Sequence, residues 1–200
     1  MRVFAAALIA ALLSGGAATA QEATPAPPAV QSVTGPQATV ETTLGAIVIA
    51  LDAAHAPATV KNFIRYAREK HFDGTVFYRI VPGALIQAGS YEAGGKFHGH
   101  LNKPVVFEGD NGLANLRGSV AMAHGDDPGS ATAEFFIDLA TLPSLDHSAS
   151  ATGFAVFGHV VSGMDVVDQI ARVPLGGKGP FAPDATPLQP VTITKVTIAQ

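Results

Sequence analysis

Two polar side chains, Arg79 and Gln87, stand eight positions apart among apolar residues in the stretch FYRIVPGALIQAG. The Pro82-Gly83 pair between them indicates a tight turn, so we expect two neighbouring strands. Arginine offers a fixed fork of hydrogen-bond donors, and glutamine offers both donors and an acceptor. Such a pair can hold a polar group by directed hydrogen bonds. Taken alone, it fits a solvated strand face equally well, because Arg and Gln are mostly exposed.

The run Asp146-His147-Ser148 contains the residue types of a hydrolytic triad. Neighbours in sequence cannot adopt the geometry in which a base activates a nucleophile, and no G-x-S-x-G turn is present. We therefore reject a hydrolase.

Four histidines raise the question of a zinc site. His98 and His100 could supply two ligands, but His124 and His147 follow at irregular spacing and no carboxylate pattern accompanies them. We expect solvated loop histidines and no metal. The GGKG run at 176–179 lacks the first glycine and the following Ser or Thr of a phosphate-binding loop.

Composition narrows the function classes. The 200 residues include no cysteine, which excludes disulfides, a thiol nucleophile and thiolate metal sites. A formal net charge of −4 without any basic run argues against nucleic acid as a partner. The 21 glycines and 14 prolines favour short strands joined by tight turns.

The amino terminus is typical of an export signal. Met1-Arg2 supplies a positive start, Val3 to Leu13 are apolar, and Ala18-Thr19-Ala20 forms a small-x-small cleavage site. We expect a signal peptide at 1–20, cleaved after Ala20, and no membrane attachment afterwards. In a host with two membranes the protein would be periplasmic. Residues 21–37 predict an extended Pro/Ala-rich linker, followed by one domain at 38–200.

The domain pattern is mainly β. Alternating apolar residues predict a hairpin at 39–52 that turns near Gly45, and apolar residues at helical spacing predict helices at 57–68 and 164–171. Further β-like runs are separated by Gly, Asp and Pro: 76–80, 85–87, 119–123, 134–138, 155–160 and a last strand from Val191. Because few helices intervene, we expect antiparallel strands in a closed barrel, with the last strand beside the first.

At this point a family resemblance becomes specific. The Arg, Pro-Gly and Gln run at 72–89, the segment NGLANLRGSVAMAHGDDPGSATAEFFIDL at 111–139, and the closing GFAVFG and GMDVV runs resemble the cyclophilins. The APATVKNF run of the first helix also fits. The segments follow the family's order over residues 39–198, and the SATAEFF spelling resembles its exported bacterial branch.

The resemblance implies a closed eight-stranded antiparallel barrel capped by two helices. It also implies a peptidyl-prolyl cis-trans isomerase that needs no cofactor. Arg79 and Gln87 would be catalytic, and Phe136 would floor a proline pocket; we expect the adjacent Phe135 to face the core. The remaining expected substrate-binding residues are Ala84, Leu85, Met122, Ala123, His124, Glu134, Leu145 and Phe154.

Four positions depart from the family pattern. Ala84 stands where cyclophilins usually carry Phe, Ser144 where Trp or Phe is common, Phe154 where many carry His, and Glu134 where Gln is usual. Full burial of a Phe side chain contributes about 1.5–3 kcal/mol, so Ala84 could weaken proline binding about ten- to a hundredfold. Ser144 predicts weak binding of cyclosporin, which the family commonly binds through an aromatic there.

Two functions therefore remain open. The first is an isomerase acting on Pro-containing segments of flexible or unfolded exported proteins. The second is a module that binds such segments as a chaperone or scaffold with little turnover. We expect a monomer in either case, because no large apolar face remains once the core is assigned.

Overall fold

The computed structural model describes residues 35–181 and 183–199. The expected signal peptide and most of the expected linker lie outside these residues. Within them the strands are β1 (Gln37–Thr42), β2 (Gly45–Leu51), β3 (Arg79–Val81), β4 (Leu85–Ala88), β5 (Ser119–Met122), β6 (Phe135–Asp138), β7 (Ala155–Ser162) and β8 (Ile193–Ala199). The helices are α1 (Pro57–Arg68) and α2 (Met164–Ala171), with short 3-10 turns η1 (Ala93–Gly95), η2 (Pro128–Ser130), η3 (Pro143–Leu145) and η4 (Pro183–Ala185).

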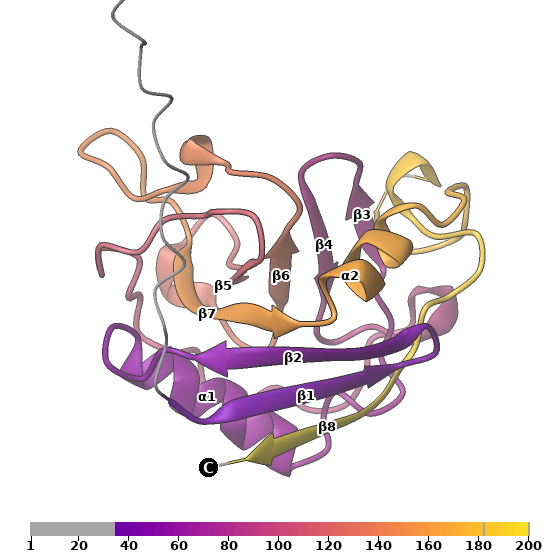
Figure 1. Cartoon of the computed structure of the whole chain (residues 1–200), viewed down its shortest axis with the longest axis horizontal. Helices are drawn as coiled ribbons and strands as arrows, with labels where there is room; N and C mark the ends of the chain where they lie inside the picture. Colours follow the sequence, from indigo (N-terminus) through magenta and orange to yellow (C-terminus); the bar gives the residue numbers. More distant parts are fainter. Residues whose placement is uncertain (1–34, 182, 200) are drawn as a thin grey trace, which may run out of the picture. The chain divides into compact units, whose positions relative to one another are not determined.

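All eight strands of the described part form one antiparallel sheet in the order β3-β4-β6-β5-β7-β2-β1-β8. Figure 1 shows β1, β2 and β8 running across the view, whereas β3, β4 and β6 run up and down it. The sheet thus curves strongly into a half-barrel. The expected hairpin is confirmed, and so is the pairing of the first and last strands. Strand β1 begins at Gln37, which pairs with Ala50 on β2 and Ala199 on β8.

The expected closure of the barrel is wrong. The edge strands β3 and β8 do not pair, and the sheet stays open. The segments just before them do meet, since Phe77 N donates to Val191 O at 3.0 Å and Ile193 N donates to Thr75 O at 2.8 Å. Val76 makes only an isolated bridge, and the strand expected at 76–80 starts at Arg79. Contact between the two edges therefore remains local.

Helix α1 has the expected bounds and begins with Pro57, whose missing N–H would have no partner in the first turn. The next two N–H groups, of Ala58 and Thr59, donate to the Glu108 carboxylate at 3.0 and 2.8 Å. A carboxylate at this end also matches the positive end of the helix dipole. A residue distant in sequence thus caps α1 and fixes the helix on the sheet.

Helix α2 follows β7 without a linker, and Gly163 makes that turn possible. Its φ is +86°, and a Cβ there would lie 2.3 Å from the Ala46 carbonyl oxygen. Both strain and collision exclude other residues. Helix α2 packs against β2 and β4, whereas α1 packs against β7 and β8. The helices and the concave side of the sheet enclose an aromatic cluster of buried residues, Phe63, Phe72, Phe77, Phe135 and Phe157.

Candidate active site

One row of residues crosses five neighbouring strands at the same register position. Arg79 on β3 pairs with Gln87 on β4, which pairs with Phe136 on β6. Phe136 pairs with Ala121 on β5, and Ala121 with Val156 on β7. Side chains at one register position project from the same face of a sheet. We call this the groove face; it lies opposite the core face.

Alternation along the strands separates the two faces. On β6, Phe135 belongs to the main core, whereas Phe136 belongs to a smaller apolar cluster. The side chains of these two neighbours therefore lie on opposite faces of the sheet. The smaller cluster, the groove cluster, joins buried and half-buried residues: Leu85, Ala121, Phe136, Val156, Val81, Leu113, Ala123, Leu145 and Phe154.

Arg79 is held at the edge of this cluster by two neighbours. Its Nη1 donates to Gln87 Oε1 at 3.0 Å. Its guanidinium carbon lies 5.0 Å from the ring centroid of Phe181, which is a cation–π distance. The guanidinium has five donors, so most of its fork remains for a ligand. The expected pairing of Arg79 with Gln87 is present.

Behind Gln87 lies a short polar chain. Gln87 Nε2 donates to Tyr78 OH at 2.6 Å, and Tyr78 OH donates to Glu134 Oε2 at 2.5 Å. Burial, and then the Glu134 charge, raises the pKa of Tyr78, so its hydroxyl stays protonated. Burial raises the pKa of Glu134 to about 7, although hydrogen bonds from Tyr78, Ser90 and Gln87 partly offset that effect. Glu134 is thus tied to protein groups beside the groove.

Aromatic rings form the wall beyond Phe136. Its ring meets that of Phe154 edge-on, with centroids 5.3 Å apart. His124 stacks on Phe154 at 4.6 Å, and its Nε2 lies 2.9 Å from the Gly153 carbonyl oxygen. Phe154 N donates to Leu145 O at 2.9 Å, which ties this wall to the η3 turn. The expected residues His124, Leu145 and Phe154 are therefore brought together.

Met122 is a correction. The sequence places it in the groove, but its side chain is 2% exposed and belongs to the main core. The reason is alternation on β5, where Ala121 faces the groove cluster and its neighbours Val120 and Met122 face inward. Ala123, after the strand, packs against the groove cluster as expected.

The two small residues that depart from the family pattern lie in turns. Ala84 is half-buried between β3 and β4, where its N donates to Val81 O and its O accepts from Leu139 N. Ser144 is exposed in the η3 turn. Neither backbone position is strained. The exposure of each site limits the size of the side chain that it can carry.

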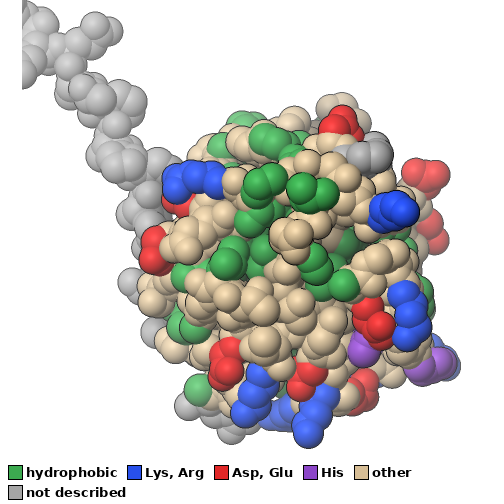
Figure 2. Space-filling view, turned by 90° about the vertical axis from the view of Figure 1, so that its right-hand side faces the viewer, with side chains coloured by type: hydrophobic (Ala, Val, Ile, Leu, Met, Phe, Trp, Pro, Cys, Tyr) green, Lys and Arg blue, Asp and Glu red, His purple; other side chains and the backbone are tan. Residues whose placement is uncertain are grey.

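Sequence reasoning missed Tyr78 and Phe181. Tyr78 directly precedes Arg79, and its position within the same motif could have drawn attention to it. Phe181 comes from the loop that follows α2 and is 42% exposed; its ring stacks on Tyr78 with centroids 5.6 Å apart. Figure 2, which views the right-hand side of Figure 1, shows hydrophobic side chains gathered in the centre of that face, with charged ones mainly toward its edge. No local pattern links Phe181 to Arg79.

A buried acid lies next to the groove cluster. Asp138 on β6 is fully buried, and both carboxyl oxygens have no hydrogen-bond partner among the described residues. Burial, and then the charge of Asp146, raises the pKa of Asp138 to about 8. The side chain is therefore largely protonated at neutral pH.

The side chains of the Asp146-His147-Ser148 run are not arranged as a catalytic triad. Asp146 Oδ1 accepts from the Asn115 amide, His147 Nδ1 lies 2.8 Å from Thr152 O, and Ser148 Oγ lies near Ser150 Oγ. These three side chains thus bond to other groups. Residues 35–181 and 183–199 contain no group of three or more His, Asp or Glu side chains that could hold a metal ion.

Comparison with known proteins agrees with this geometry. Residues 37–198 match the family described as cyclophilin type peptidyl-prolyl cis-trans isomerase/CLD. The chain is 40% identical to peptidyl-prolyl cis-trans isomerase A of Dickeya dadantii over 171 residues, covering 86% of this chain and 88% of that protein. It is 41% identical to peptidyl-prolyl cis-trans isomerase B of Escherichia coli over 165 residues, covering 81% and 99%.

A solved structure shares the fold. The crystal structure of a Cryptosporidium parvum cyclophilin type peptidyl-prolyl cis-trans isomerase, determined in the presence of the dipeptide Ala-Pro, superposes with a TM-score of 0.65. The sequences are 19% identical, and the match covers 82% of this chain and 99% of that chain.

Proposed function

Since this chain belongs to the family of cyclophilin-type peptidyl-prolyl cis-trans isomerases and is such an enzyme, we propose that Arg79, Gln87 and Phe136 carry its reaction. The observation that supports this proposal is the register row, which places the guanidinium of Arg79 and the amide of Gln87 on the same face of the sheet as Phe136. These are the groups that a catalyst of amide rotation requires.

The reaction itself explains why these groups suffice. Rotation about an amide costs about 18–20 kcal/mol because the C–N bond has partial double-bond character. The two isomers of an X–Pro bond differ little in energy but exchange over tens to hundreds of seconds. A catalyst must bind the twisted bond more tightly than either planar form. No bond is broken, so neither a nucleophile nor a cofactor is required.

Each residue has a defined part in this proposal. Phe136, with Leu85 and Phe154, receives the proline ring. Arg79 donates to the prolyl carbonyl and toward the imide nitrogen, which favours loss of resonance. Gln87 holds Arg79 in place and offers its amide to the substrate backbone.

The residues before the proline would lie along the wall that Ala123 and His124 form. Ala123 packs against the groove cluster, and His124 is half-buried on the Phe154 ring. Ala84 leaves the other side of the pocket with less apolar surface than the family usually offers. Proline-containing segments should therefore bind weakly.

The substrates that we propose are flexible or unfolded exported polypeptides, met in the periplasm. Support comes from the sequence of residues 1–20 and from the bacterial isomerases to which the chain is similar. Among the described residues no helix is long and apolar enough to cross a membrane. We further propose that the domain acts as a monomer and without nucleic acid.

A second function, a chaperone or scaffold that binds proline segments with little turnover, is favoured by two observations. Ala84 and Ser144 both depart from the family pattern beside the proposed pocket, and a pocket altered in this way would lower turnover. Arg79 and Gln87 in hydrogen-bonded register favour turnover.

A protease-coupled assay on an Ala-Pro peptide separates these functions. We expect wild type to exceed the uncatalysed rate, Arg79→Ala to lose about a hundredfold in kcat/KM, and Ala84→Phe to gain about tenfold. If wild type and Arg79→Ala both equal the uncatalysed rate, the roles assigned above fail and the binding module stands.

A further inference from the structure

The polar chain behind Arg79 links four side chains from three separate segments. Arg79 Nη1 donates to Gln87 Oε1 at 3.0 Å, Gln87 Nε2 donates to Tyr78 OH at 2.6 Å, and Tyr78 OH donates to Glu134 Oε2 at 2.5 Å. Arg79 begins β3 and Tyr78 directly precedes it, Gln87 lies on β4, and Glu134 is the residue before β6. The chain runs from the groove into the protein.

The direction of these bonds follows from the charge at the inner end. An ionised carboxylate can only accept, so the Tyr78 hydroxyl must donate to Glu134. The Tyr78 oxygen is then left as an acceptor, and the NH₂ of Gln87 turns toward it. The amide oxygen of Gln87 therefore faces Arg79, whose guanidinium can only donate.

We propose that Glu134 is a positioning residue for Arg79: its carboxylate sets the direction of the hydrogen bonds through Tyr78 and Gln87, and the isomerase is fully active only while Glu134 is ionised. The inference rests on the roles proposed above for Arg79 and Gln87. It adds a proton-dependent control of those roles.

Protonation of Glu134 on Oε2 reverses the direction of these hydrogen bonds. Oε2 is the favoured position, because an O–H on Oε1 would be buried without an acceptor among the described residues. The carboxyl O–H then donates to the Tyr78 oxygen, and the Tyr78 hydroxyl turns to Gln87. The amide then presents its NH₂ to the guanidinium, donor against donor. Arg79 loses its polar partner and keeps only the weaker contact with the Phe181 ring.

The surroundings place this switch in the neutral pH range. Glu134 packs so closely on β4 that a Cβ on Gly89 would lie 2.6 Å from its Cα. Its second oxygen, Oε1, is buried without a hydrogen-bond partner among the described residues, although the nearby Ser90 still favours the charged form. Burial is the larger effect and raises the pKa of Glu134 to about 7.

Other titratable groups lie near Glu134. On the β4 side, Tyr91 lies against Tyr78, with ring centroids 4.7 Å apart. On the β5 side, Ala123 N donates to Glu134 O, and His124 is the next residue. Arg79, at the opposite end of this hydrogen-bonded chain of four side chains, is its permanent cation.

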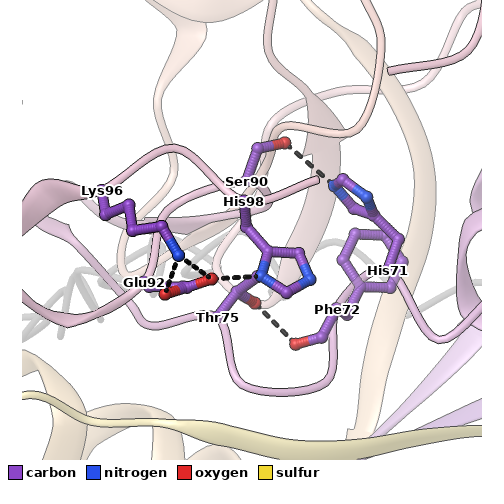
Figure 3. Close-up of polar contacts among 7 residues, drawn as sticks. All are labelled: His71, Phe72, Thr75, Ser90, Glu92, Lys96 and His98. Carbon is purple, nitrogen blue, oxygen red and sulfur yellow. Dashed lines mark hydrogen bonds and ion pairs between the residues drawn. The ribbon is translucent and has the colours of Figure 1, made fainter. Parts of the chain in front are cut away.

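Beyond Ser90 lies a second polar cluster, shown in Figure 3. His71 Nε2 lies 3.1 Å from Ser90 Oγ. Burial, and then His98, lowers the pKa of His71, which is therefore neutral at pH 7. His98 and Lys96 both pair with Glu92. His71 thus gives Ser90 a hydrogen bond without adding a charge next to Glu134.

The test is the pH profile of kcat/KM between pH 5.5 and 8.5, on a proline peptide without titratable side chains. For wild type we expect a rise of about three- to tenfold from pH 6 to pH 8, with a midpoint near 7. For Glu134→Gln we expect a flat profile, because the amide carries no proton that titrates in this range. Tyr78→Phe should be several-fold slower and also flat.

His124→Asn is the matched control, because His124 is the other titratable side chain near Glu134 along the groove. Whatever its rate, its midpoint should equal that of wild type. A flat wild-type profile, a Glu134→Gln profile like that of wild type, or a midpoint displaced by His124→Asn would each overturn the proposal. Arg79→Ala tests the proposed catalytic roles separately, since it should lose about a hundredfold in kcat/KM at every pH whether or not Glu134 controls it.

Discussion

Strand β6 carries different kinds of side chain on its two faces. On the core face, Phe135 lies edge-on to Phe63 and Phe72, with ring centroids 5.5 and 5.6 Å apart. On the groove face, Phe136 is followed two residues later by Asp138, a buried acid without a partner among the described residues. Phe135 and Phe136 are equally buried, at 0% and 2% exposed.

The degree of burial alone therefore does not distinguish residues that stabilise this fold from residues that serve its function. The core face contains interlocking aromatic rings, whose removal leaves a cavity. The groove face keeps charged and titratable groups where desolvation disfavours them. A face that is retained despite this cost is where a ligand is expected to bind.

The largest effect should come from the pair of neighbouring phenylalanines. Phe135→Ala should lower the free energy of unfolding by about 3–5 kcal/mol, because it leaves a cavity among rings that cannot close it. Phe136→Ala should cost less stability, since its cluster opens to the groove, but should reduce kcat/KM more than tenfold. Urea unfolding and the peptide assay measure the two quantities. Equal loss of stability in both variants would contradict the distinction between the faces.

The next effect concerns Asp138. Its pKa is raised to about 8, above the ordinary 3.8, so the folded protein holds an extra proton between these values. Stability must then fall as pH rises from about 4 to about 8, by at most about 6 kcal/mol through this group. Asp138→Asn should remove that loss.

Thermal unfolding of wild type and Asp138→Asn at pH 5 and pH 8 provides the check. We expect the variant to be the more stable protein at pH 8 by about 2–4 kcal/mol, and the two to differ little at pH 5. A variant that is less stable than wild type at pH 8 would show that the carboxyl has a partner.

Much of this fold could be predicted from local patterns. Both helices have their expected bounds because apolar residues recur at helical spacing and Pro57 marks a start. The first hairpin follows from alternation around Gly45. The openness of the sheet could not be predicted. It depends on whether the edge strands β3 and β8 pair, and no local sequence pattern encodes that pairing.

The site divides in the same way. Arg79, Gln87 and Phe136 stand in a recognisable motif, and pairing between strands then brings them together. Met122 was placed wrongly because strand register, which only the fold fixes, turns it into the core. Phe181 escaped notice because it reaches Arg79 from an irregular segment a hundred residues further along.

A smaller effect is expected for cyclosporin at the exposed η3 turn. Ser144 offers no ring there, so wild type should bind the drug weakly. Ser144→Trp should tighten binding about tenfold, because part of an indole would be buried against the ligand. Isothermal titration of both proteins measures this, with Ser144→Ala as the control. Nanomolar affinity of wild type would contradict the expectation.

The smallest effect should come from the ring against Arg79. Phe181→Ala should lower kcat/KM about two- to fivefold, since a partly exposed cation–π contact contributes about 0.5–1 kcal/mol. Phe181→Tyr should restore the rate, whereas Phe181→Leu, which keeps the bulk without the ring, should not. Equal rates for the Leu and Tyr variants would show that the ring contributes only volume.

A peptide titration followed by backbone-amide NMR shows directly whether substrate binds at the groove face. A hollow of about 590 Å³ lies between α1 and residues 103–105, lined by Lys61, Arg65 and Lys103 among others. If the groove face binds substrate, an Ala-Pro peptide should shift amide signals from residues 79–88, 121–124, 134–138 and 154–156 and leave those of α1 unchanged. Shifts centred on α1 and residues 103–105, with the groove face unaffected, would contradict the account.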